Sequence, residues 1–453
     1  MPRSLVRELV RLGWPMLVAQ LAVMANSVID TVMAGRYATL DLAAVGIGSS
    51  IYVSVFVALM GVLLALTPIV AQMHGAGRHA DIGEELRQGV WLAAALTLIS
   101  FALFAHPEPL LAVARLEPAL EAKVRAYLHV LAFAVPASLL FRVFYSFSTA
   151  ISRPRTVMAL TLIGLALKVP LNWVFMYGNF GAPELGSTGC AVATALISWI
   201  LCALAWTWCW FEPDYRPYRV FARWSWPNAK ALGRILSLGL PIGFTFLIDV
   251  TGFTFMALFI ARLGPLYSAA HQIAANLAAL CYMLPLALGN AASVVVGQSL
   301  GASQPARARA AGLTGIALAL ACALVLGACL YWFAHGIAGL YTGDARLRGV
   351  AAGLIAFVAV YHQFDAIQAV AVNVLRGYRR AVVPMLIYAV ALWGVGLGGG
   401  YALGLTRVDL AWLGLSTPMG APGFWLAAIA SLVLASSLVT AYFLRVSRAA
   451  LSD

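Results

Sequence analysis

The stretch from Leu238 to Ile260 reads Leu-Gly-Leu-Pro-Ile-Gly-Phe-Thr-Phe-Leu-Ile-Asp-Val-Thr-Gly-Phe-Thr-Phe-Met-Ala-Leu-Phe-Ile. It is long enough and apolar enough to cross a bilayer as a helix. Its carboxylate, Asp249, lies near the middle, between Arg234 and Arg262. At a rise of ~1.5 Å per residue, Asp249 is roughly 20 Å from either charged end. An ionised Asp at that depth costs about 2.5 kcal/mol or more, so we expect it to face protein or water and to serve a function.

The composition of the whole chain agrees with that stretch. The 453 residues are 62% hydrophobic and 10% charged, whereas a soluble domain carries about 25% charged residues. A polytopic membrane protein is therefore predicted, and a soluble globular protein is excluded. The net charge of +12 does not indicate nucleic-acid binding, because the basic residues lie in short segments between apolar spans. Lipid is the expected surrounding.

The apolar spans predict an all-α membrane protein with twelve transmembrane helices. They are residues 12–35, 43–73, 88–107, 126–150, 156–178, 188–211, 234–261, 266–297, 308–334, 349–375, 381–405 and 422–444. The longest connection, 212–233, divides the chain into halves. The expected parts are an N-terminal six-helix lobe (1–211), a cytoplasmic linker (212–233) and a C-terminal six-helix lobe (234–453).

The lysine and arginine residues predict the orientation of the chain. The N-terminus, the even-numbered connections and the C-terminus together hold more than twice as many of them as the odd-numbered connections. Because cytoplasmic loops carry the excess of basic residues, both termini and the linker are expected in the cytoplasm.

An internal repeat relates the two halves. Leu12-Gly13-Trp14-Pro15 matches Leu238-Gly239-Leu240-Pro241 at an offset of 226 residues, and the same offset pairs Ala43–Ile47 with Ala269–Ile273. Six spans repeated in one orientation predict two bundles related by an axis along the membrane normal. Secondary transporters often use this plan, although a channel or a scaffold could also contain such a duplication.

Three acids lie inside spans: Asp30, Asp249 and Asp365. Asp249 and Asp365 both belong to the C-terminal half and lie near mid-membrane. Two carboxylates at one depth can share a proton or hold a small cation such as Na⁺ between them, and either arrangement suits coupling to an ion. The alternative is that each acid is hydrogen-bonded separately within the bundle.

Other polar residues suggest a wet cavity and a buried ion pair. Gln272 and Asn276 lie one helical turn apart in the eighth span, and Tyr282 lies deeper, where its ring could face a cation or simply pack. Lys168 lies deep in the fifth span, and Asp30 is the acid available to it in the spans of that half. The alternative is a neutral or hydrated Lys168.

The sequence does not predict an enzyme or a need for a cofactor. It contains no GxxxxGK[ST] motif, so ATP is not the expected energy source, and no HExxH or GxSxG motif. A sodium ion or a proton is the expected coupling species.

Several stretches resemble the multidrug and toxic compound extrusion (MATE) family, in particular its NorM-like bacterial branch. They are Asp30–Gly35, Val169–Gly178, Ala269–Ile273 and Asn373–Tyr378. The resemblance extends nearly from end to end. It implies twelve helices in two lobes, a V-shaped central cavity that opens to either side, and export of cationic, often aromatic drugs against inward sodium or proton flow.

The resemblance also assigns residues to sites. Asp249, Tyr282 and Asp365 look like the cation site of the C-terminal lobe. The implied drug contacts are Gln272, Asn276, Ser50 and Asp344, and the implied polar site of the N-terminal lobe contains Asp30, Lys168 and Asn172.

Two departures from the family pattern concern these sites. Relatives usually have Glu at the position of Asp249, and the shorter side chain could change the ion preference. They usually have Asn at the position of Lys168, where an ammonium beside Asp30 would compete with any bound ion.

The sequence thus predicts a monomeric antiporter in a bacterial cytoplasmic membrane that exports cationic amphipathic compounds and confers drug resistance. One alternative is a flippase for lipid-linked precursors, whose cavity should carry several basic residues; here the spans contain Arg142 and Lys168. Another alternative is a membrane sensor or scaffold without transport, for which no output module is visible.

Overall fold

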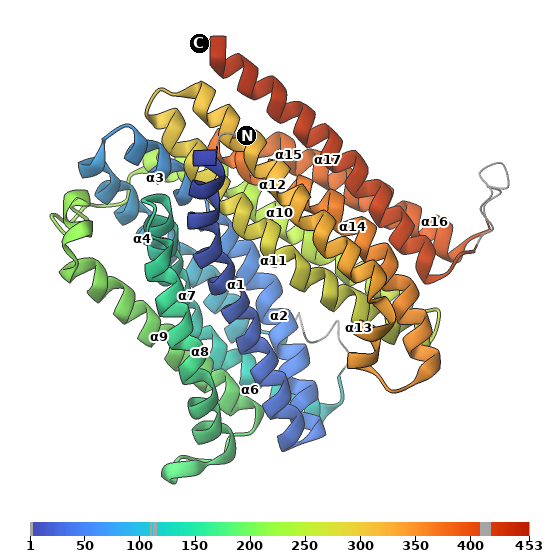
Figure 1. Cartoon of the computed structure of the whole chain (residues 1–453). Helices are drawn as coiled ribbons and strands as arrows, with labels where there is room; N and C mark the ends of the chain where they lie inside the picture. Colours follow the sequence, from blue (N-terminus) through green and yellow to red (C-terminus); the bar gives the residue numbers. More distant parts are fainter. Residues whose placement is uncertain (1–2, 109–110, 112–115, 408–417, 453) are drawn as a thin grey trace. The chain divides into compact units, whose positions relative to one another are not determined.

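The computed structural model describes residues 3–108, 111, 116–407 and 418–452, which form helices and their connections (Figure 1). In this part of the chain, eleven helices are long and apolar enough to cross a membrane. A further pair, α6 and α7, is bent by 44° and makes a twelfth span if the pair counts as one. The prediction of an all-helical membrane protein with twelve spans is confirmed.

The N-terminal half contains eight numbered α-helices and two short 3-10 segments among its described residues. They are α1 (Arg3–Tyr37), α2 (Thr39–Leu63), α3 (Leu66–Gly75), α4 (His79–Ala105), α6 (Pro118–Ala132), α7 (Ala134–Ala150), α8 (Pro154–Tyr177), η1 (Asn179–Gly181), α9 (Ser187–Phe211) and η2 (Pro213–Tyr218). Proline at the first helical position begins α6 and α8, where its missing N–H costs no intrahelical bond. Gly178 ends α8 with a φ of 72°, a left-handed conformation that favours glycine.

The C-terminal half follows with α10 (Ala229–Ala261), α11 (Pro265–Gly301), α12 (Pro305–Trp332), α13 (Ala334–Tyr341), α14 (Ala345–Gly377), α15 (Val382–Ala389), η3 (Val390–Gly398), α16 (Gly399–Leu405) and α17 (Ala421–Ser452). The segment η3 is π-helical and joins α15 to α16 in one span, Val382–Leu405. Such wide turns often occur next to functional residues.

The chain divides into two compact units, and their boundaries differ from the predicted ones. We call Val18–Gly243 the N-terminal unit, and Met1–Leu17 with Phe244–Asp453 the C-terminal unit. Each boundary therefore falls inside a long helix, α1 or α10.

Packing within each unit explains the difference. Leu9 and Met16 of α1 are buried in a cluster that includes Val295 of α11, so the start of the chain belongs to the C-terminal unit. In the N-terminal unit, a Cβ on Gly239 would lie 2.3 Å from the carbonyl oxygen of Val62. The early part of α10 therefore packs closely on α2.

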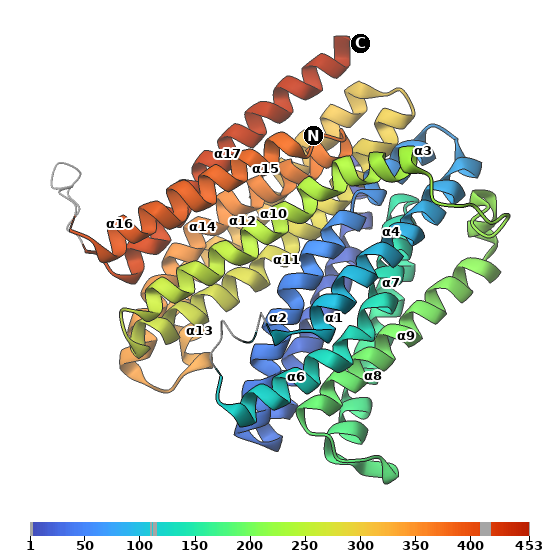
Figure 2. The same ribbon diagram turned by 180° about the vertical axis from the view of Figure 1, so that it is seen from behind.

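Helix α14 is the central element of the C-terminal unit and packs against α11, α12 and α17. Both ribbon views show α12, α14 and α17 side by side (Figures 1 and 2). A Cβ on Gly252 of α10 would meet Leu392 of η3 at 2.7 Å, so these two segments also approach closely. This approach places the middle of α10 beside the end of α15.

Candidate functional site

The C-terminal unit brings Asp249, Tyr282 and Asp365 to one cavity of about 140 Å³. They come from three helices, α10, α11 and α14, so no local sequence segment makes the site. Asp365 is 5% exposed, and Tyr361, one turn before it on α14, lines the same cavity. Two carboxylates that line one small cavity can share a proton or hold a cation.

Asp249 has a hydrogen-bond partner that the sequence reasoning missed. The hydroxyl of Tyr388 on α15 donates to Asp249 Oδ1 at 2.6 Å. Hydrogen bonds to an ionised carboxylate are shorter and stronger than those between neutral groups. Tyr388 is buried in an apolar helix without a charged neighbour in sequence, so its pattern is that of an ordinary packing residue.

A second, smaller cavity of about 20 Å³ also contains Asp249 and Tyr282, together with Gln368, Asn373 and Arg376. These three follow Asp365 along α14, toward the end of that helix at Gly377. Arg376 Nη1 donates to Asn373 Oδ1 at 3.1 Å. Asp249 and Tyr282 therefore line both cavities.

The N-terminal unit contains the ion pair that the sequence suggested. Lys168 Nζ lies 2.9 Å from Asp30 Oδ2, and the Lys168 side chain is 2% exposed. Asn172 Nδ2 donates to the other oxygen, Asp30 Oδ1, at 2.7 Å. Both oxygens of Asp30 are thus engaged by side chains of α8.

Lys168 also donates to Thr194 Oγ1 of α9 at 2.6 Å. Sequence reasoning missed Thr194, which in turn donates to the carbonyl of Cys190 one turn earlier. A Thr inside an apolar helix usually bonds its own backbone in this way, so nothing in the sequence distinguished it. The ammonium of Lys168 is consequently held by α1 and α9 at once.

Three of the four residues implied as drug contacts form local hydrogen bonds in the structure. Asn276 Oδ1 accepts from the Tyr341 hydroxyl at 3.0 Å, and Gln272 is exposed on the same helix, α11. Ser50, in the N-terminal unit, donates to the carbonyl of Gly46. Asp344 caps α14 by accepting from the Arg346 amide at 2.8 Å. Their contact with a drug remains a prediction.

The described residues contain no group of three or more His, Cys, Asp and Glu side chains placed to hold a metal ion. A sodium ion bound by Asp249 and Asp365 would need further oxygen ligands from the phenols and backbone around the cavity. This sodium site also remains a prediction.

Comparison with known sequences gives matches over most of the chain. The MatE family model matches residues 15–174 and 241–402. A probable multidrug resistance protein NorM of Aromatoleum aromaticum is 42% identical over 94% of this chain and 91% of the relative. Multidrug resistance protein PmpM of Pseudomonas aeruginosa is 37% identical over 98% and 92%. Multidrug resistance protein NorM of Vibrio cholerae is 37% identical over 95% and 93%.

Solved structures share the fold over the full length. The bent form of the Vibrio cholerae MATE transporter VcmN has a TM-score of 0.86 at 20% identity and covers 99% of this chain and 98% of its own. An outward-facing multidrug resistance MATE family transporter has a TM-score of 0.88 at 18% identity, with coverage of 98% and 96%. At these identities the likeness concerns the fold alone.

Proposed function

Because this chain belongs to the MatE family, whose members are transporters and not enzymes, we propose that it is a multidrug efflux antiporter of a bacterial inner membrane. It exports cationic amphipathic compounds in exchange for an inward sodium ion or proton. The proposal extends to this chain what the names of its relatives say of them, namely multidrug resistance.

The shared cavity of Asp249 and Asp365 is the observation that carries the coupling mechanism. When both carboxylates are ionised and the cavity holds no cation, their negative charges repel each other. The site then attracts a cation from whichever side of the membrane the cavity is open to. When a proton or sodium ion occupies the cavity, the charge is compensated and the helices can pack more closely. Tyr388 holds Asp249 in place through its hydroxyl, so occupancy of the cavity also acts on α15.

The orientation and assembly state belong to the same proposal. The excess of Lys and Arg at the termini and even-numbered connections supports cytoplasmic termini. We propose that the protein acts as a monomer, because each unit supplies its own buried acid pair or ion pair.

Efflux of ethidium from vesicles containing the purified protein tests the proposal. An inward sodium gradient and an inward proton gradient are imposed separately, each with the other held at zero. Efflux under at least one gradient, and none in vesicles with no gradient, is expected. Equal efflux with and without either gradient would contradict coupling.

Replacing Tyr388 by Phe should lower the rate of coupled efflux by about tenfold. The ring still fills its place, but Asp249 loses a hydrogen bond to a charged group, which is worth roughly one order of magnitude. The measurement is ethidium efflux at equal amounts of reconstituted protein. Tyr331→Phe, at an exposed position on α12, serves as the control. An unchanged efflux rate in Tyr388→Phe would show that the hydrogen bond from Tyr388 does not position Asp249 for transport.

Replacing Tyr282 should have an effect that depends on the ring. Tyr282→Phe should retain much of the activity, because an aromatic face remains at the cavity for a cation, whereas Tyr282→Ala should lose most of it. Efflux rates of the two variants, at matched protein amounts, provide the comparison. Equal rates for Phe and Ala would assign the ring to packing.

A further inference from the structure

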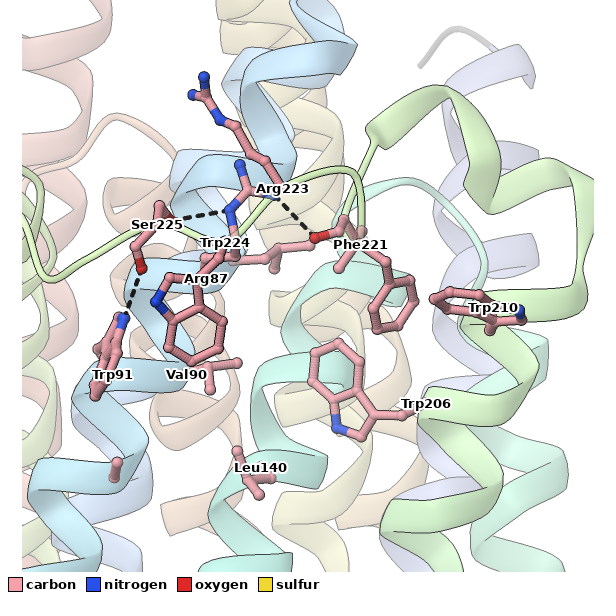
Figure 3. A pocket seen from close by; sticks show the side chains of 13 residues that line it. Arg87, Val90, Trp91, Leu140, Trp206, Trp210, Phe221, Arg223, Trp224 and Ser225 are labelled. Carbon is pink, nitrogen blue, oxygen red and sulfur yellow. Dashed lines mark hydrogen bonds between the residues drawn. The ribbon is translucent and has the colours of Figure 1, made fainter.

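The N-terminal unit contains a larger cavity, of about 540 Å³, outside both acid sites. It lies between α4, α7, α9 and the segment that leads from η2 to α10 (Figure 3). Its volume is within the ~300–1,000 Å³ range of small-molecule sites. Nothing in the proposed coupling mechanism uses it.

The lining of this cavity changes from polar to apolar along its length. Arg87, Arg223 and Ser225 lie at the end near the connecting segment, and Leu140 of α7 lies at the opposite end, inside a span (Figure 3). Trp206 lies between them, in the last turns of α9 before Phe211. The cavity therefore begins at the end of the helices, where indole rings favour the membrane interface, and extends to the depth of the hydrocarbon.

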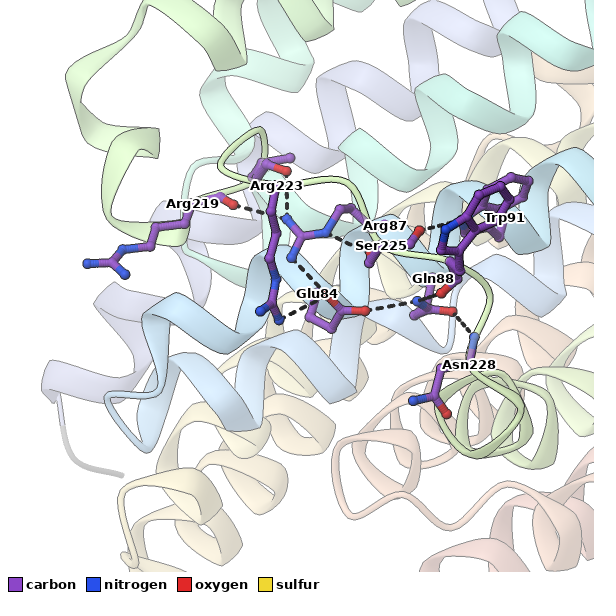
Figure 4. A network of polar contacts seen from close by, with 10 residues as sticks. Glu84, Arg87, Gln88, Trp91, Arg219, Arg223, Ser225 and Asn228 are labelled. Atoms are coloured by element: carbon purple, nitrogen blue, oxygen red, sulfur yellow. Dashed lines mark hydrogen bonds and ion pairs between the residues drawn. The ribbon is translucent and has the colours of Figure 1, made fainter.

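The wall of the cavity is held by a polar network (Figure 4). Arg87 Nε donates to Ser225 Oγ at 3.0 Å, and Arg87 Nη1 donates to the carbonyl of Val220 at 2.9 Å. Its Nη2 donates to Glu84 at 2.8 Å, and Trp91 Nε1 donates to the carbonyl of Ser225 at 3.0 Å. The guanidinium of Arg87 is thus used to fix the connecting segment to α4.

Arg223 differs from Arg87 because most of its side chain is available. It is 71% exposed, and its contact with Glu84 measures 3.4 Å, which is long for a charge-assisted bond. Arg219 and Arg216, in the same connecting region, are also exposed. The polar end of the cavity therefore presents a cationic donor above an apolar interior.

We propose that this cavity binds one anionic phospholipid of the cytoplasmic leaflet. The phosphate contacts Arg223, and an acyl chain enters beside Trp206 toward Leu140. A basic pocket between helices at the cytoplasmic side suits an anionic headgroup. The same charge disfavours the cationic compounds proposed as substrates, and a zwitterionic lipid gains less because its own positive group opposes Arg223. The inference rests on the proposed cytoplasmic placement of the connecting segment, but it does not depend on transport or on the coupling ion.

Native mass spectrometry of the full-length protein in detergent tests the site. Phosphatidylglycerol and phosphatidylcholine with identical acyl chains are titrated separately, and the bound lipids are counted. We expect one tightly held phosphatidylglycerol. Arg223→Gln should lower the affinity for phosphatidylglycerol by about tenfold, because the phosphate loses a hydrogen bond to a charged group. Ala94→Phe should also weaken it, because Ala94 lines the apolar part.

Arg216→Gln is the matched control, since it removes the same charge from the same region but does not line the cavity. Its affinity for phosphatidylglycerol should equal that of the wild type. If Arg216→Gln and Arg223→Gln weaken phosphatidylglycerol binding equally, the lipid responds only to the overall positive charge around the cavity. That result would overturn the proposal. An effect of Arg223→Gln without one of Ala94→Phe would indicate a phosphate contact outside the cavity, and would overturn it as well.

A second measurement leaves the charge of the cavity unchanged. Bromine on the acyl chain quenches nearby indoles, so brominated phosphatidylglycerol should quench Trp206 more than brominated phosphatidylcholine does. The fluorescence of Trp206 is obtained as the part of the total tryptophan fluorescence that is lost in the Trp206→Phe variant. Trp208, which is exposed on the same helix and does not line the cavity, should be quenched equally by both lipids. Equal quenching of Trp206 by both would contradict selective binding.

Discussion

Replacing Asp249 or Asp365 by Asn should abolish coupled efflux in either case, and replacing both should be no worse than replacing one. The two carboxylates line the same cavity, so each helps set the proton or ion occupancy of the other, and they act as a unit. Removing one charge leaves a site that cannot attract and release the coupling ion. The effects of the two substitutions should therefore not add.

Ethidium efflux from vesicles and drug resistance of expressing cells are the measurements, at equal amounts of protein in the membrane. Asp81→Asn, at an exposed position paired with Arg78, is the control for loss of one Asp. Near-wild-type drug resistance in either single variant would contradict the proposal that Asp249 and Asp365 act as one site. A double variant far worse than both singles would show two independent acids.

Replacing Lys168 by Met should strongly reduce the yield of folded protein or its transport, and adding Asp30→Asn should recover part of the loss. The single change leaves the carboxylate of Asp30 buried without the ammonium that lies 2.9 Å from it. Breaking a buried pair by removing one partner costs roughly 3–5 kcal/mol, whereas removing both partners is milder. Asn172 would still donate to Asp30, which limits the loss.

Detergent-extracted yield, melting temperature and efflux of the two single variants and the double variant give a complete cycle. Lys230→Met, at an exposed position in the first turn of α10, is the control for the same side-chain change. If the double variant is as impaired as the two singles combined, the pair contributes no coupling energy. The inference that Lys168 and Asp30 act as a pair would then be wrong.

The features that depend on depth in the membrane could be predicted from sequence. An isolated Asp inside a run of apolar residues marked Asp249. Elimination paired Lys168 with Asp30, because no other acid of the sequence lies in the predicted spans of that half. The ion pair is present in the structure. Burial makes such charges costly, so they are few and their partners can be inferred.

The features that depend on neighbouring helices could not be predicted. Tyr388 and Thr194 are ordinary residues of apolar helices until packing places them at Asp249 and Lys168. The division into these two units could not be predicted either, because hydropathy shows where a span begins but not which bundle its residues join. Met16 looks like any other apolar residue of the first predicted span, and Leu9 lies just before that span.

The membership of Met1–Leu17 in the C-terminal unit has a consequence for biosynthesis. The first turns of α1 leave the ribosome long before their neighbours in the buried cluster, such as Val295 and Val374, are made. At roughly 5–20 residues per second, those partners follow only after tens of seconds. During that interval Leu9 and Met16 must be shielded by lipid or by the insertion machinery, and the first helix reaches its final packing among the last. A chain truncated after α9 would therefore leave this end of α1 without its native partners.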